Sequence, residues 1–280
     1  MHIPRIWAKA DAEVAATGDR KLALVAWGWG DDEAQARGEA SSRLERLVER
    51  MRRGEPFPKA YAYGSRPLRE EILQNFDGAG EPRAILTRNA YGTTVLNTAR
   101  LAFLDIDLDE SGESFGQRLR RLFAGASRED TVLAKLRDTL KASGKATFRL
   151  YRTAAGFRAL AVDREFDPAG QEAQDLMKAT GTDPYFVRLC SVQKSFRARL
   201  TPKPWRCGLK PPPGEYPRTD PAIQQLFAAW LAEYERISSK YATCKFLESV
   251  GKGAFSAMGD TELVDLHDRM TRATQLLPLA

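Results

Sequence analysis

Three aspartates alternate with apolar residues in the segment Phe103–Glu110, FLDIDLDE. In a β-strand, side chains two residues apart lie on the same face, so a strand here would place Asp105, Asp107 and Asp109 together. Neighbouring carboxylates repel one another unless a positive charge neutralises them, and their oxygens are the ligands that Mg²⁺ and Mn²⁺ prefer. The segment therefore predicts a metal site at Asp105 and Asp107. A strand that simply ends in a solvated acidic loop is the alternative, but it explains Asp105 poorly, because that residue lies within an apolar run.

Two arginines flank a short turn in the segment Tyr151–Arg158. The turn, Ala154-Ala155-Gly156, joins two apolar runs and predicts a β-hairpin. A guanidinium group binds phosphate through two parallel hydrogen bonds, so Arg152 and Arg158 are candidate phosphate ligands. Pairing of either arginine with an acid on a neighbouring strand explains the sequence equally well.

The excess positive charge of the chain lies in the stretch Arg188–Arg218. This stretch has eight basic residues and one acidic residue, a charge of +7, whereas the whole chain carries +6. Basic residues with aromatics between them suit phosphate contact and base stacking. The candidate phosphate ligands are Arg197, Arg199, Lys203 and Arg206, and the candidate stacking residues are Phe196 and Trp205. The alternatives are a loop that pairs with the chain's own acids and a surface that binds an acidic protein.

These segments, in this order, resemble the motifs of the archaeo-eukaryotic primase–polymerase superfamily. That superfamily has an acidic strand motif hhhDhD/E, a hairpin motif ending in Gly-x-His, a later aspartate and a basic stretch of the type RxPGxxxK. Here the corresponding segments are Phe103–Asp107, Thr153–Arg158 and Arg199–Lys203. Asp183 is the best candidate for the later aspartate, with Asp163 as the alternative.

The resemblance implies a metal-dependent nucleotidyltransferase that acts on nucleoside triphosphates and nucleic acid. It implies that Asp105, Asp107 and Asp183 hold two Mg²⁺ or Mn²⁺ ions, one to activate a 3′-hydroxyl and one to neutralise the triphosphate. Arg158 stands where the superfamily has histidine, and arginine keeps the charge but changes reach and geometry. The alternative is therefore a non-catalytic module that binds nucleic acid or nucleotides on a degenerate palm.

The composition argues against several other kinds of site. The chain has 280 residues, 43% of them hydrophobic, which suffices for a packed core and excludes a disordered chain. Three cysteines without a Cys-x-x-Cys pair argue against a disulfide framework and a cysteine-rich zinc site. The two histidines, His2 and His267, lie at opposite ends, so both are interpreted as surface or helix-face residues.

No apolar run approaches the roughly 20 residues of a membrane-spanning helix, so we expect no membrane partner. The segment Met1–Lys9 has charges and a proline where a signal peptide would need an apolar core. These features predict a cytoplasmic protein.

Strands and helices that alternate, with two hairpins among them, predict an α+β fold. We expect a mixed or antiparallel sheet with covering helices, and the resemblance implies an RRM-like palm. The predicted strands are Lys21–Trp29, Ala84–Arg88, Thr93–Thr98, Arg100–Leu108, Thr147–Arg152 and Phe157–Val162. The predicted helices are Asp32 to about Met51, Leu68–Phe76, Gln117–Phe123, Thr131–Leu140 and Gly170–Thr180.

The proline-rich segment Lys210–Gly214 is the clearest break in the chain. Beyond it, Leu226, Trp230 and Tyr234 recur at helical spacing. We therefore predict an α+β domain at residues 1–210 and a helical extension at residues 211–280 that packs on it.

Overall fold

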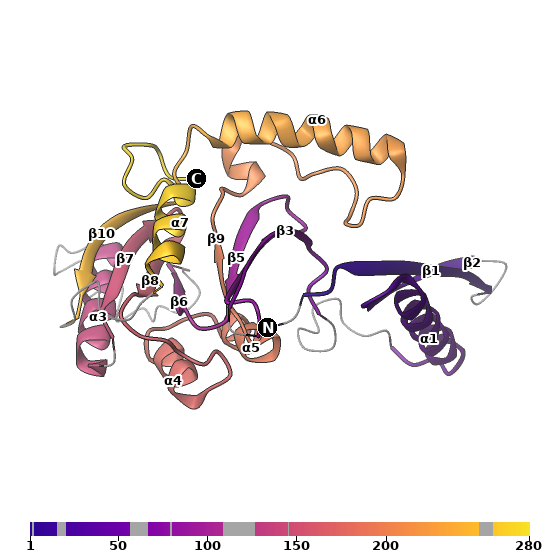
Figure 1. Ribbon diagram of the computed structural model, residues 1–280, viewed down its shortest axis with the longest axis horizontal. Helices are drawn as coiled ribbons and strands as arrows, with labels where there is room; N and C mark the ends of the chain where they lie inside the picture. Colours follow the sequence, from indigo (N-terminus) through magenta and orange to yellow (C-terminus); the bar gives the residue numbers. More distant parts are fainter. Residues whose placement is uncertain are drawn as a thin grey trace. The chain divides into compact units, whose positions relative to one another are not determined.

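The structure is a computed structural model that describes residues 1, 3–15, 21–56, 67–78, 80–108, 127–144, 146–251 and 260–280 (Figure 1). The chain divides into two compact units, one formed by His2–Ile72 and the other by Leu73–Ala280 with Met1. The predicted helix Gln117–Phe123 and the acidic residues Asp109 and Glu110 lie outside the described residues.

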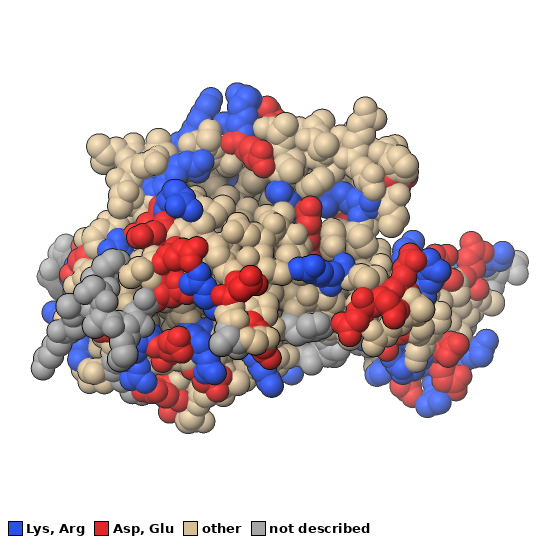
Figure 2. Space-filling model, viewed as in Figure 1, with Lys and Arg blue, Asp and Glu red and all other residues tan. Residues whose placement is uncertain are grey.

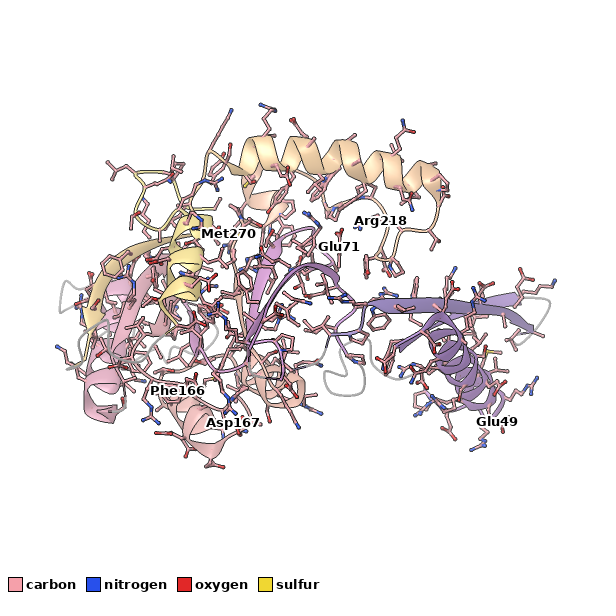
Figure 3. The ribbon with its side chains drawn as sticks, in the orientation of Figure 1. Glu49, Glu71, Phe166, Asp167, Arg218 and Met270 are labelled. Atoms are coloured by element: carbon pink, nitrogen blue, oxygen red, sulfur yellow. The ribbon has the colours of Figure 1, made fainter. Side chains whose placement is uncertain are left out.

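Most of the described part of the unit His2–Ile72 is a long β-hairpin followed by a helix. β1 (Ile6–Ala15) pairs antiparallel with β2 (Lys21–Gly30), and α1 (Glu33–Arg52) follows. Asp32 caps α1 by accepting a hydrogen bond from the backbone N–H of Gln35, which confirms the predicted helix start. Gly28 allows the helix to lie close to the hairpin, because a Cβ atom there would lie 2.1 Å from the backbone nitrogen of Ala40. Charged side chains of α1, such as Glu49, lie in solvent (Figure 3).

The unit Leu73–Ala280 is built on two four-stranded sheets, with strand orders β10-β7-β8-β6 and β3-β4-β5-β9. The strands are β3 (Glu71–Phe76), β4 (Ala84–Arg88), β5 (Thr94–Thr98), β6 (Phe103–Asp107), β7 (Phe148–Thr153), β8 (Gly156–Ala161), β9 (Phe196–Arg199) and β10 (Cys244–Val250). The helices among the described residues of this unit are α3 (Arg128–Ser143), α4 (Gln171–Ala179), α5 (Pro184–Gln193), the short 3₁₀ helix η2 (Pro204–Cys207), α6 (Pro221–Ser238) and α7 (Thr261–Thr271).

Both predicted hairpins are confirmed, and so is the α+β class with antiparallel sheets. In the β4–β5 turn, Asn89 Oδ1 accepts hydrogen bonds from the backbone N–H groups of Tyr91 and Thr93, at 3.0 and 3.1 Å. This local hydrogen bonding is the reason that Asn favours turns. Gly92 completes the turn with a φ of 76°, a conformation that favours glycine.

Two predictions about elements are wrong. Leu68–Phe76 was expected to be a helix, but Glu71–Phe76 forms β3 at the edge of a sheet. Residues 211–280 were expected to be helical throughout, but they include β10, which pairs with β7. In both cases the partner strand supplies backbone hydrogen bonds that the segment by itself does not reveal. The two compact units meet along the chain near residue 72, and residues 211–280 belong to the same unit as the two four-stranded sheets.

The sheet β10-β7-β8-β6 carries much of the core of the larger unit. Phe103, Phe148 and Phe157 are buried in it, and α7 crosses one face of the sheet with Leu263 and Val264 in the same core (Figure 1). Among the residues that the structure describes, no helix has both the length and the apolar composition that crossing a bilayer requires.

Candidate phosphate-binding site

The predicted acidic strand, the hairpin and the basic stretch meet at one small cavity. Its volume is about 60 Å³. The charged residues that line it are Asp105, Asp107, Arg158, Arg199, Lys203 and Arg206. Among the described residues of the lining, cationic side chains therefore outnumber acidic side chains by four to two. On the face of the molecule that Figure 2 shows, acidic and basic side chains are interspersed.

Strand register brings Asp105 and Arg158 together. β6 pairs antiparallel with β8, and Asp105 lies directly opposite Arg158. Arg158 Nε donates to Asp105 Oδ1 at 2.7 Å, and its NH2 group donates to Oδ2 at 3.1 Å. The Arg158 side chain is only 2% exposed, whereas that of Asp105 is 34% exposed. Although burial opposes the charge on Arg158, Asp105 raises the pKa of the guanidinium and keeps it positive.

The segment after β9 supplies the other cations. Arg199 ends β9, Lys203 precedes the 3₁₀ helix η2, and Arg206 lies within it. Burial lowers the pKa of Arg199, and the neighbouring Arg158 lowers it further. Burial, followed by Arg199 and Arg206, lowers the pKa of Lys203. Like charges are thus held close together, and a bound anion would relieve their repulsion.

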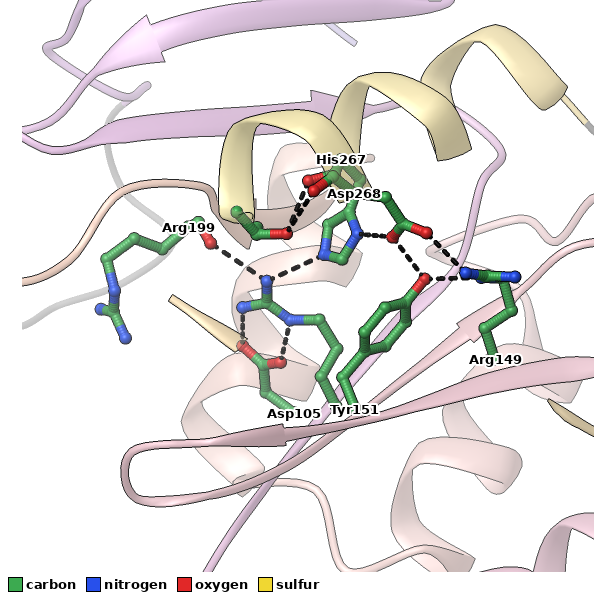
Figure 4. A network of polar contacts seen from close by, with 8 residues as sticks. Asp105, Arg149, Tyr151, Arg199, His267 and Asp268 are labelled. Atoms are coloured by element: carbon green, nitrogen blue, oxygen red, sulfur yellow. Dashed lines mark hydrogen bonds and ion pairs between the residues drawn. The ribbon is translucent and has the colours of Figure 1, made fainter. Parts of the chain in front are cut away.

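A buried polar network continues behind Arg158, as the dashed lines in Figure 4 show. The NH1 group of Arg158 lies 3.3 Å from His267 Nε2, and His267 Nδ1 lies 2.9 Å from Asp268 Oδ1. Asp268 also accepts hydrogen bonds from the Tyr151 hydroxyl and from Arg149, both at 2.6 Å. Burial alone would raise the pKa of Asp268, but hydrogen bonds from His267 and Tyr151 lower it.

His267 was interpreted as a surface or helix-face residue; it does lie on a face of α7, but it is not at the surface. It is completely buried on α7, and its ring lies 4.9 Å from the ring of Tyr151 and 5.5 Å from that of Phe103. The sequence contained one usable signal, because His267 follows Leu263 and Val264 at helical spacing and so lies on their apolar face. The partner on β8, 109 residues away, could not be found from sequence.

Two further predicted acids do not line the cavity. Asp183 caps α5 and accepts a hydrogen bond from the backbone N–H of Tyr185 at 2.9 Å. Asp163 accepts a hydrogen bond from the backbone N–H of Thr147 at 2.8 Å. The position of Asp183 before Pro184, at the start of a helix, has the usual features of a helix cap.

The remaining predicted residues have different environments. Arg152 lies on the same hairpin as Arg158 but forms an ion pair with Glu129 at the start of α3. Arg197 is buried on β9, opposite Asn97, and does not line the cavity. Phe196 is 0% exposed in the core, so the prediction that it stacks on a base is wrong. Trp205 is 46% exposed, and its ring lies 5.1 Å from that of Tyr91.

The described residues do not fit the divalent metal centre that the resemblance implies. Both carboxylate oxygens of Asp105 accept hydrogen bonds from Arg158, which occupies the positions that a metal would need. Asp107 is the only other acid in the described lining, and the described parts of the chain contain no group of three metal-ligating side chains. The excess of cations also favours an anion over a metal ion at this place.

Comparisons with protein-family models, with curated proteins and with solved structures find no match to this chain.

Proposed function

We propose that this chain binds phosphate groups of single-stranded nucleic acid, or of a nucleotide, at the cavity between β6, β8 and the segment after β9. The observation that carries the proposal is the set of four cations at a cavity of about 60 Å³. Pockets that enclose whole ligands measure about 300–1,000 Å³, so this one admits a single anionic group and leaves the rest of the ligand outside.

An exposed aromatic pair beside the cavity supports a nucleic-acid ligand. Lys203, which lines the cavity, has its Nζ atom 5.4 Å from the ring centre of Trp205. The Trp205 ring in turn packs edge-on against Tyr91, which is also exposed. A phosphate at Lys203 would therefore place an adjoining base within reach of an aromatic surface, and such stacking is worth about 1–3 kcal/mol per base.

Binding of a tetramethylrhodamine-labelled single-stranded oligonucleotide, followed by fluorescence anisotropy at several salt concentrations, tests the proposal. We expect the Lys203→Ala/Arg206→Ala variant to bind more weakly and to reduce the slope of log affinity against log salt by about 0.7 for each lost phosphate contact. Lys178→Ala, an exposed lysine on α4 outside the cavity lining, is the matched control. Equal affinities and slopes for the wild type and the double variant would refute the proposal.

Metal-dependent nucleotidyl transfer, which the resemblance implies, is the alternative; Asp105 and Asp107 both line the cavity, but the hydrogen bonds from Arg158 to both oxygens of Asp105 disfavour it. Incubation with Mn²⁺, labelled nucleotides and primed or unprimed template tests it. Product that disappears in Asp107→Asn would establish the activity. Binding without product would leave the non-catalytic module as the function.

A further inference from the structure

The contacts of His267 allow only one protonation state. A guanidinium nitrogen can only donate, so the nitrogen that faces Arg158 NH1 at 3.3 Å, His267 Nε2, must be unprotonated. An ionised carboxylate can only accept, so the nitrogen that faces Asp268 Oδ1 at 2.9 Å, Nδ1, must carry a proton. These two contacts together require a neutral imidazole with its proton on Nδ1.

We infer that His267 is a positioning residue, whose neutral Nδ1–H form holds the Arg158 guanidinium against Asp105 and so prepares the cavity for an anion. Arg158 NH1 donates to the backbone oxygen of Arg199 at 3.0 Å as well as facing His267. The backbone oxygen and the imidazole therefore fix one end of the guanidinium while Asp105 holds the other. The consequence for ligand binding rests on the proposed function, whereas the protonation state of His267 does not.

The charges around the imidazole explain why a second proton would disturb this arrangement. Three neighbouring strands carry these groups: Asp105 lies on β6, Arg158 on β8, and Arg149 and the hydroxyl of Tyr151 on β7. Asp268 on α7 contributes the second carboxylate, and burial raises the pKa of the Cys244 thiol on β10 to about 11, so that group stays neutral. The two carboxylates and two guanidinium groups balance, so an imidazolium would be an uncompensated charge beside Arg158.

Protonation of His267 would place an N–H group on Nε2, directly facing the N–H groups of Arg158 NH1. Repulsion would then move the guanidinium away from Asp105 and leave an unneutralised carboxylate at the cavity wall, where it repels an anion. Burial disfavours the imidazolium and lowers the pKa of His267 from its ordinary value of 6.5. The neutral form therefore stabilises the fold above pH 6.5, and this stabilisation is lost as the pH falls below that value toward the lowered pKa.

Nitrogen NMR of the imidazole rings tests the protonation state directly. The chain has only two histidines, so ¹⁵N-histidine labelling gives two ring systems, and His2→Gln removes one of them. We expect His267 to be neutral near pH 7, with its proton on Nδ1. An imidazolium, or a neutral ring protonated on Nε2, would overturn the inference whether or not the protein binds any ligand.

Oligonucleotide binding by two variants tests the positioning role. His267→Gln supplies an oxygen that can accept from Arg158 at every pH, so we expect near-normal affinity that no longer falls in acid. His267→Phe supplies no acceptor, so we expect the affinity to fall about tenfold or more, as for the loss of a hydrogen bond to a charged group. The tetramethylrhodamine label and the phosphodiester groups do not titrate between pH 5 and 7, and Asp265→Asn, an exposed acid on α7, is the control.

Two outcomes would overturn the positioning role. One is an equal loss of affinity in His267→Gln and His267→Phe, which would indicate a purely structural residue. The other is an acid-dependent loss of binding that persists in His267→Gln. If the wild type binds no oligonucleotide at any pH, the proposed function fails, and the NMR result still decides the protonation state.

Discussion

In the unit His2–Ile72, several ion pairs of α1 join residues four apart, such as Glu33 and Arg37, whose side chains are about 70% exposed. In the unit Leu73–Ala280, Asp105 pairs with Arg158 across 53 residues, and Arg149 pairs with Asp268 across 119. Water screens the first kind of pair, which contributes little to stability, whereas the second kind is shielded and strongly coupled. The same residue types thus serve different purposes: exposed local pairs, such as that of Glu33 and Arg37, solvate the surface, whereas the pairs behind the cavity orient a buried guanidinium.

Among the variants considered, Asp105→Ala is expected to lower the free energy of unfolding most. The substitution leaves Arg158 buried without its carboxylate, so we expect the free energy of unfolding to fall by about 3–5 kcal/mol. Urea unfolding followed by circular dichroism measures the change. Asp265→Ala removes an exposed acid from α7 and is the control. A loss as small as that of the control would mean that the Asp105–Arg158 pair is not shielded from water.

Tyr151→Phe should have the next largest effect. The Tyr151 hydroxyl donates to Asp268 and accepts from Arg149 Nε at 2.8 Å, so its removal takes one donor from a buried carboxylate. We expect a loss of about 1.5–3 kcal/mol in the same unfolding experiment, as for a hydrogen bond to a charged group. An unchanged free energy of unfolding would show that water replaces the hydroxyl and that the network is open to solvent.

Gly28→Ala tests whether the close packing of α1 on the β1–β2 hairpin stabilises the unit His2–Ile72. The added Cβ would meet the backbone of Ala36 and Ala40 at 2.3 and 2.1 Å, so α1 must move away from the hairpin. We expect a cost of about 1–3 kcal/mol and faster amide hydrogen exchange in α1. Gly38→Ala is the matched control, because nothing lies within 4 Å of its added Cβ and alanine favours helix. Similar exchange in both variants would argue against close packing at Gly28.

Glu33→Ala should have the smallest effect. It breaks the exposed pair with Arg37, so we expect the stability to change by no more than about 0.5 kcal/mol, and the difference to vanish at high salt. Thermal unfolding at low and high salt measures it. A change as large as that in Asp105→Ala would remove the distinction between the two kinds of ion pair.

Local sequence features predicted several elements well. Asp32 marked the start of α1, and Asn89 with Gly92 marked the β4–β5 turn, because caps and turns depend on hydrogen bonds and backbone angles within a few residues. The strands β3 and β10 were missed, since pairing with a neighbouring strand of the sheet determines their conformation. Phe196 was misplaced for a related reason: its neighbours along the chain are basic, but its neighbours in space are apolar.

The sequence by itself determined the types of charge available for a site and the order in which they occur: the acids of Phe103–Asp107, the arginines of the β7–β8 hairpin and the cations of Arg199–Arg206. It left open whether Arg158 faces a phosphate or an acid. The tertiary structure decided that question, because antiparallel register places Arg158 opposite Asp105 and α7 brings His267 to its other side. Register and helix packing are fixed by burial of the whole core, so the partners of a buried charge are not encoded in the residues next to it.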